Sequence, residues 1–167
     1  MSVYYKQMIR GIDVDEENGR LAKVKFTVPA TPVPGPQTTP QLSADDRLAN
    51  QGDSLIYQGK YREAREVFMS VLERNPKNAR ALYGTAVAAS NMRKPDTAED
   101  YFHKTLDVAR DLRVVTWSHI YLGRIYDLEG KRNQALEHYR AASVTATAYP
   151  NAIRAVQNGL QRPFGSK

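Results

Sequence analysis

Two stretches of this chain repeat one another, and their shared pattern restricts the fold more than any other feature. The first is YQGKYREAREVF at residues 57–68, and the second is LEGKRNQALEHY at residues 128–139. Both carry Gly-Lys at the third and fourth positions, Ala at the eighth and an aromatic residue at the twelfth. A weaker copy, ALYGTAVAASNMRKPDTAEDYFHKTL, lies between them at residues 81–106. Its Ala98 follows Ala64 by 34 residues and precedes Ala135 by 37.

Each copy is typical of two amphipathic helices joined by a short turn. Gly59 and Gly130 stand where the turn needs a backbone without the strain that a Cβ atom brings. The pair Asn75-Pro76 ends the second helix of the first copy, because the residue before proline avoids helical angles. Pro95 suits the first turn of a helix, where its missing N–H loses no hydrogen bond. One hairpin cannot bury its apolar face alone, so the copies are expected to stack.

The small and aromatic residues of the copies predict how the helices pack. Small residues are expected where two helices of one hairpin cross closely. Aromatic residues are expected to fill the space between neighbouring hairpins. The residues predicted to define this packing are Gly52, Ala64, Phe68, Ala98, Phe102, Gly123, Ala135 and Tyr139.

The period of about 34 residues and these positions resemble the tetratricopeptide repeat (TPR) family. The resemblance covers about residues 45–147. The second copy departs from the family pattern, with Ala86 at a usual glycine, Arg93 at the turn glycine and Pro95 at the turn aromatic. The resemblance implies a mainly α fold, a TPR-like α-solenoid of three helical hairpins with a C-terminal capping helix. The expected domain is 44–167, with repeats at about 45–78, 79–112 and 116–149 and the capping helix at about 151–162.

The residues before this domain follow other patterns. Val24, Phe26 and Val28 alternate with polar residues, and DEENG at residues 15–19 supplies turn residues. Residues 1–28 are therefore predicted to form a β-hairpin. Residues 29–43 contain five prolines, which favour an extended, semi-rigid linker.

The sequence indicates no catalytic or metal chemistry. It contains no cysteine, which excludes thiolate metal sites and a cysteine nucleophile. The acidic run at residues 13–19 lacks the glycine and the final glutamate of a calcium loop and is better explained as the hairpin turn. His103, His119 and His138 are expected to be isolated from one another. We therefore expect a protein that is not an enzyme and has no cofactor.

The family resemblance implies a concave surface lined by the first helices of the hairpins. A mixture of Tyr, Trp and Arg there suits the binding of a protein segment, because these residues dominate interaction hot spots. The predicted function is a non-enzymatic scaffold or adaptor that is a subunit or assembly factor of a larger complex. The predicted groove residues are Asp53, Tyr57, Arg80, Tyr83, Asn91, Trp117, Ile120, Arg124 and Asp127.

The charge distribution keeps two alternatives open. The net charge is +6, and residues 110–167 carry nine Lys or Arg against four Asp or Glu. This basic third could bind nucleic acid or another anionic surface, although no nucleic-acid motif accompanies it and nucleic acid is the less favoured partner. The chain could also be an accessory domain of a longer protein. No apolar run approaches the roughly 20 residues of a membrane helix, so we expect no transmembrane segment. The expected location is cytoplasmic, either free or peripheral to a larger membrane-associated complex.

Overall fold

The computed structural model describes residues 42–166, and all regular secondary structure in this range is helical. The predicted β-hairpin at 1–28 and nearly all of the predicted linker at 29–43 lie outside the described residues. The helices are α2 Ala44–Tyr57, α3 Tyr61–Arg74, α4 Ala79–Asn91, α5 Pro95–Val108, α6 Leu112–Leu128, α7 Arg132–Thr145, the short 3-10 helix η2 Ala146–Ala148, and α8 Pro150–Gln161.

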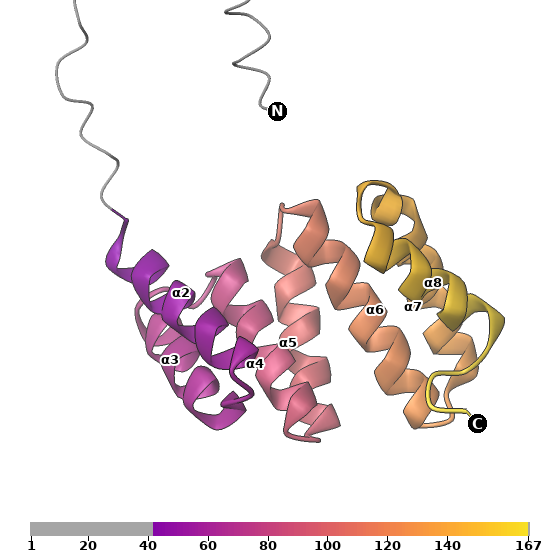
Figure 1. Cartoon of the computed structure of the whole chain (residues 1–167), viewed down its shortest axis with the longest axis horizontal. Helices are drawn as coiled ribbons and strands as arrows, with labels where there is room; N and C mark the ends of the chain where they lie inside the picture. Colours follow the sequence, from indigo (N-terminus) through magenta and orange to yellow (C-terminus); the bar gives the residue numbers. More distant parts are fainter. Residues whose placement is uncertain (1–41, 167) are drawn as a thin grey trace, which may run out of the picture. The chain divides into compact units, whose positions relative to one another are not determined.

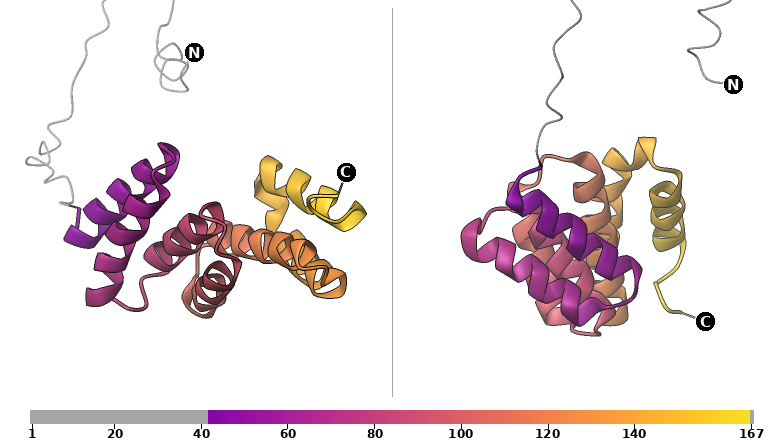
Figure 2. Two further views of the ribbon diagram at one scale, coloured as in Figure 1. Left: turned by 90° about the horizontal axis from the view of Figure 1, so that it is seen from below. Right: turned by 60° about the vertical axis from the view of Figure 1, so that its left-hand side comes forward.

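The helices pair into antiparallel hairpins, α2 with α3, α4 with α5, and α6 with α7 (Figure 1). Each hairpin contacts the next through α3 and α4 or through α5 and α6, and α8 packs on α7 and α6. Helices α2, α4, α6 and α8 form one layer, and α3, α5 and α7 form the other (Figure 2, left). The result is a solenoid in which each hairpin buries its apolar face against its neighbours.

Local signals in the sequence set the ends of the helices. The side chain of Ser43 accepts a hydrogen bond from the Asp46 N–H at 3.0 Å, and Asp46 reaches back to Ser43 in a capping box. The Asn78 side chain caps α4, and the Asp111 side chain caps α6. Pro95 stands in the first turn of α5, as its sequence position predicts.

The turns within the three hairpins share one backbone conformation. Gly59 and Gly130 adopt φ values of 76° and 73°, in the left-handed region that favours glycine. Arg93 takes the same place in the second hairpin with φ 57°. The departure of the second copy from the family pattern is therefore accommodated by a strained arginine and not by a different turn.

An aromatic ring lies at each joint of the solenoid, both between successive hairpins and between the last hairpin and α8. Phe68 is fully buried between α2 and α4, where a Cβ atom on Gly52 or on Gly84 would lie within 3 Å of the ring. Tyr139 occupies the corresponding place between α6 and α8. A Cβ atom on Gly123 or on Gly159 would meet its ring in the same way. These glycines let the helices approach the rings closely.

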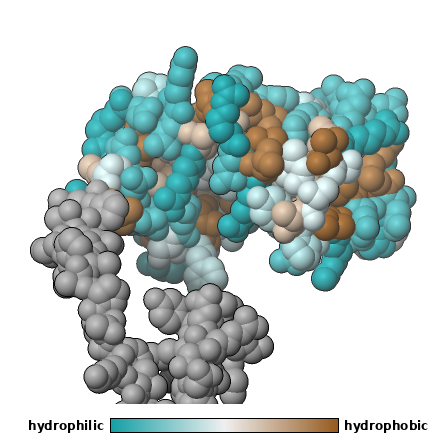
Figure 3. All heavy atoms as spheres, turned by 90° about the horizontal axis from the view of Figure 1, so that it is seen from above, coloured by the Kyte–Doolittle hydropathy of each residue, from teal (hydrophilic) through white to brown (hydrophobic). Residues whose placement is uncertain are grey.

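The residues predicted to define the packing all lie in the interior. Ala64, Ala98 and Ala135 have no exposed surface, and neither has Phe102. Seen from the side on which α2 and α6 begin, the surface is mostly hydrophilic, with hydrophobic residues between (Figure 3). Within residues 42–166, no helix combines the length and the apolar character needed to cross a membrane.

Candidate functional site

A groove of about 720 Å³ opens on the layer formed by α2, α4 and α6. Helix α2 contributes one residue to it, α4 contributes three, and α6 with its cap contributes the rest. The lining residues are Asp53, Ala79, Arg80, Tyr83, Asp111, Arg113, Val114, Trp117 and Tyr121. All three hairpins therefore meet at this site.

Aromatic side chains form one wall of the groove. The Tyr121 ring stacks on Phe102, and Tyr83 meets Phe102 edge-on with ring centroids 6.0 Å apart. Trp117 lies tilted against Tyr121 at 6.3 Å. Such offset and edge-on contacts are favourable for aromatic pairs and fix the rings against a buried residue. The wall is thus held in place from behind by Phe102.

The origin of this wall is a difference between two joints of the solenoid. At the first joint, α4 presents Gly84 to the ring of Phe68. At the second joint, α6 presents Tyr121 to the ring of Phe102. A large side chain thus stands where the first joint has none. The joint between α4 and α6 consequently carries the aromatic surface of the groove.

The acidic residues of the groove are already engaged within the protein. The Arg80 Nε atom donates to Oδ2 of Asp53 at 3.1 Å, and its Nη2 donates to Oδ1 of Asn50 at 2.7 Å. Asp111 accepts a hydrogen bond from the Arg113 N–H at 2.8 Å as the cap of α6. Each of these carboxylates therefore has a partner before any ligand binds.

Two arginines at the groove have no such partner. Within residues 42–166, neither Arg113 nor Arg124 forms an ion pair with a carboxylate. The Arg124 guanidinium lies over the rings of Tyr121 and Phe164, 5.6 and 5.0 Å from their centroids. Such cation–π contacts orient the guanidinium without neutralising it.

The tyrosines of the wall keep their protons at physiological pH. Burial raises the pKa of Tyr83 far above its ordinary value, and the charges of Arg113 and Arg124 oppose this only in part. Burial also raises the pKa of Tyr121. Both hydroxyls are therefore available as hydrogen-bond donors and acceptors.

The structure brings together some of the predicted groove residues and separates others. Asp53, Arg80, Tyr83 and Trp117 all line the groove. Arg124 lines an adjacent pocket of about 240 Å³ under the C-terminal residues. The structure places the remaining predicted residues, Tyr57, Asn91, Ile120 and Asp127, outside the groove.

These remaining residues have other surroundings. Tyr57 ends α2 with 95% of its surface exposed, and the Asn91 side chain donates to the Val87 carbonyl at 2.8 Å. Ile120 is fully buried in a cluster with Ala142 and Val156. Their positions on the first helices are those the repeat pattern gives, but their side chains do not line the cavity.

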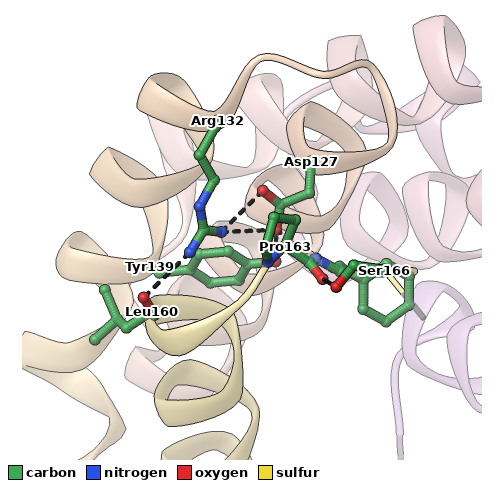
Figure 4. A network of polar contacts seen from close by, with 7 residues as sticks. Asp127, Arg132, Tyr139, Leu160, Pro163 and Ser166 are labelled. Carbon is green, nitrogen blue, oxygen red and sulfur yellow. Dashed lines mark hydrogen bonds and ion pairs between the residues drawn. The ribbon is translucent and has the colours of Figure 1, made fainter.

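Asp127 holds the C-terminal end of the described chain (Figure 4). Its carboxylate accepts hydrogen bonds from Nη1 of Arg132 at 2.9 and 3.1 Å and from the Tyr139 hydroxyl at 3.0 Å. It also accepts the Phe164 N–H at 2.8 Å. Arg132 donates in addition to the Leu160 carbonyl at 3.1 Å. Asp127 thereby ties α6, α7 and the segment after α8 together.

The expectation that the three histidines are isolated is wrong. Nδ1 of His119 lies 3.0 Å from Nδ1 of His138, and the His103 ring lies edge-on to His138 at 5.9 Å. The three residues come from α6, α7 and α5, so their spacing along the chain gave no sign that the helix faces meet. Within residues 42–166, no group of three or more side chains has an arrangement that could hold a metal ion.

Tyr121, Arg113 and Val114 line the groove but were not among the predicted residues. A signal for two of them exists in the sequence. Arg113, Trp117 and Tyr121 follow one another at intervals of four, which places them on one face of a helix. Arg113 lies one helical turn before Trp117 on that face and Tyr121 lies one turn after it, so the prediction of Trp117 could have been extended to both.

Comparison with known proteins agrees with this geometry. Residues 50–111 match the model of the family described as tetratricopeptide repeat. This stretch of the chain is a tetratricopeptide repeat region. No match was found among curated proteins.

Solved structures share the fold of the helical domain at low sequence identity. A T3SS complex from Aeromonas hydrophila aligns at 18% identity and a TM-score of 0.61, over 70% of this chain and 78% of the other. The type III secretion translocator chaperone SycD of Yersinia enterocolitica aligns at 17% and 0.60, over 72% and 85%. PcrH in complex with the chaperone binding region of PopD aligns at 17% and 0.59, over 72% and 92%.

Proposed function

We propose that this protein is a non-enzymatic scaffold that binds an extended segment of a partner protein in the groove between α4 and α6. The observation that carries the proposal is the aromatic wall of Tyr83, Trp117 and Tyr121 in a cavity of about 720 Å³. Tyr, Trp and Arg are the residues that most often dominate binding energy at protein interfaces. Residues of all three types line this one cavity.

The polar groups of the wall suit a peptide backbone. Within residues 42–166, the hydroxyls of Tyr83 and Tyr121 and the indole N–H of Trp117 form no side-chain hydrogen bonds. Each can donate to a carbonyl of an extended segment, while the ring beside it covers an apolar side chain. An apolar surface with a few oriented polar groups is the usual form of a ligand site.

The structural neighbours support a segment of another protein as the partner. The PcrH structure contains a region of another protein, PopD, bound to a chain of similar fold. At 17% identity this likeness concerns the fold, and the groove residues of the present chain carry the proposal. The proposal extends to a role as subunit or assembly factor of a larger complex, with a cytoplasmic location.

A second candidate function is the binding of nucleic acid or another anionic surface. The observation in its favour is that Arg113 and Arg124 lack carboxylate partners within residues 42–166. Trp117 and Tyr121 could also stack on bases. This candidate predicts binding that weakens steeply with added salt, since phosphate contacts release counterions.

Selection from a random-peptide library displayed on phage tests the proposal. Peptides of roughly twelve residues can span about 40 Å when extended. A selected peptide that carries a benzophenone group is then cross-linked to the full chain and the adducts are mapped by mass spectrometry. We expect adducts on α4 and α6.

Matched variants make the test specific to the groove. Trp117→Ala should lose binding of the selected peptide, while Val144→Ala on the exposed face of α7 should retain it. Tyr83→Phe removes one hydroxyl without changing the packing and should weaken binding. Adducts confined to α3, α5 and α7, or unchanged binding by Trp117→Ala with an unchanged melting temperature, would reject the proposal.

A further inference from the structure

The acidic and basic residues that line the groove are equal in number. Its lining includes Asp53 and Asp111 on one side and Arg80 and Arg113 on the other. Arg80 is neutralised by Asp53, and Asp111 is committed to the first turn of α6. Within the described chain, neither Arg113 nor Asp111 forms an ion pair, and their opposite charges cancel formally. The groove lining alone is therefore neutral, and a positive excess arises only together with the pocket beside it.

The adjacent pocket supplies a positive excess. Its lining contains Arg124 and Arg162 and no acidic residue. Along α6, Arg113 precedes Trp117 and Arg124 follows Tyr121, and the charges of both arginines act on the hydroxyl of Tyr83. Tyr121 joins the two cavities, because it lines the groove and also lies under the Arg124 guanidinium. Within residues 42–166, this surface thus carries two guanidinium groups without ion-pair partners around a shared aromatic centre.

We propose that the segment bound in this groove is acidic, with one carboxylate on Arg113, another on Arg124 and an apolar side chain against Trp117 between them. This inference rests on the proposed peptide-binding function and assigns the chemistry of its ligand. Guanidinium groups bind carboxylates through paired, charge-assisted hydrogen bonds that fix geometry as well as sign. The aromatic wall adds an apolar contact for the side chain that lies between the two carboxylates.

The same groups disfavour the other occupants. A basic segment would place cations beside Arg113 and Arg124, whose positive charges would repel them. Nucleic acid carries a charge at every unit, and its phosphates would approach the carboxylates of Asp53 and Asp111 as well as the arginines. An acidic peptide can instead alternate carboxylates with neutral residues.

The phage selection described above supplies the ligand for a direct test. We expect Asp and Glu to be enriched among the selected peptides relative to the starting library. One selected peptide is then synthesised with a fluorescent label, together with a version in which its acidic residues are replaced by Asn and Gln. Fluorescence anisotropy on the full chain should give a dissociation constant about tenfold higher for the neutral version.

Variants assign the preference to the two arginines. Arg113→Gln and Arg124→Gln should each reduce the difference between the acidic and neutral peptides. Arg140→Gln removes the same charge from the exposed face of α7 and should leave that difference unchanged. Arg113→Glu should shift the preference toward a peptide whose acidic residues are replaced by Lys, which a general loss of stability could not produce.

The outcomes separate this inference from the function on which it rests. If peptides bind the groove but the acidic and neutral versions bind equally, the inference is wrong and the peptide-binding function stands. If no peptide cross-links to α4 or α6, both fail. If a single-stranded DNA oligonucleotide binds more tightly than every peptide and requires Arg113 and Arg124, the ligand is nucleic acid and the inference is overturned.

Discussion

The ring of Tyr121 stacks on the ring of Phe102, with centroids 5.0 Å apart and planes inclined by 13°. This contact joins the second hairpin to the third and also positions the wall of the groove. One residue therefore contributes both to the stability of the solenoid and to the proposed binding surface.

Replacement of Tyr121 by alanine should affect both properties. Tyr121→Ala removes a half-buried ring and should lower the free energy of unfolding by about 2 kcal/mol. Tyr121→Phe keeps the stack and removes a hydroxyl that has no hydrogen-bond partner within the described chain, so its stability should be nearly unchanged. Urea unfolding monitored by circular dichroism measures both. Equal stabilities for the two variants would contradict the importance of the stack.

A methyl group at Gly84 should destabilise the first joint. It would meet the ring of Phe68, which is fully buried and cannot move aside. Overpacking of this kind costs about 1–3 kcal/mol, so Gly84→Ala should lower the urea midpoint. Gln51→Ala, a change of side chain on the exposed face of α2, serves as the control and should change the midpoint little.

Arg93→Gly should stabilise the protein. Arg93 holds φ 57°, a conformation that costs a residue with a Cβ atom roughly 1 kcal/mol relative to glycine. The reciprocal change, Gly130→Arg at the equivalent turn of the third hairpin, should destabilise by a similar amount. Thermal unfolding of both variants checks the pair. A lower melting temperature for Arg93→Gly would show that the arginine side chain makes a compensating contact.

Two ion pairs of different burial should differ in their contribution to stability. Asp127→Ala leaves Arg132 and the Tyr139 hydroxyl without their buried partner and should cost about 3 kcal/mol. Asp100→Ala breaks an exposed pair with Lys104 and should cost well under about 1 kcal/mol. Urea midpoints of the two variants give the comparison, and equal losses would contradict the structural role of Asp127.

The histidine cluster should make stability depend on pH. Burial, and then the neighbouring His119 and His103, lower the pKa of His138 to about 4. The unfolded chain therefore takes up a proton near pH 6.5, which the folded protein resists until about pH 4. Stability should be full above pH 6.5 and fall as the pH decreases toward 4.

Several titratable and charged groups surround the histidine cluster. His103 and Glu99 face it from α5, Tyr126 faces it from α6, and Lys131 lies over the Tyr126 ring. His138→Gln should flatten the pH dependence of the urea midpoint between pH 6.5 and 4, whereas Glu137→Gln, an exposed change on the same helix, should leave it intact. An unchanged slope in His138→Gln would place the titrating group elsewhere.

The sequence was sufficient to predict the family and the helical character of the described residues. The reason is physical: the spacing of Gly52, Ala64 and Phe68 recurs because one packing problem recurs in each hairpin. The TPR assignment is confirmed by the family match over residues 50–111, and the all-helical fold by the structure of residues 42–166. The hairpin predicted for residues 1–28 stays a prediction.

The groove was harder to predict because its shape depends on contacts between repeats. Tyr121 becomes part of the wall only because it stacks on Phe102, a residue of the preceding hairpin. Asp127 has the repeat position of a groove residue, but three donors from α7 and the C-terminal segment surround its carboxylate. The histidine cluster was missed for the same reason, since its members meet only after α5, α6 and α7 pack.

The three joints of the solenoid differ in what their aromatic ring meets. At the first and last joints, glycine backbone from two helices lies against the ring of Phe68 or Tyr139. At the middle joint, the ring of Phe102 instead meets the nearly parallel ring of Tyr121. A change of side chain at position 121 should therefore alter the spacing of two hairpins and the wall of the groove together, whereas changes at the glycines should disturb the outer joints alone.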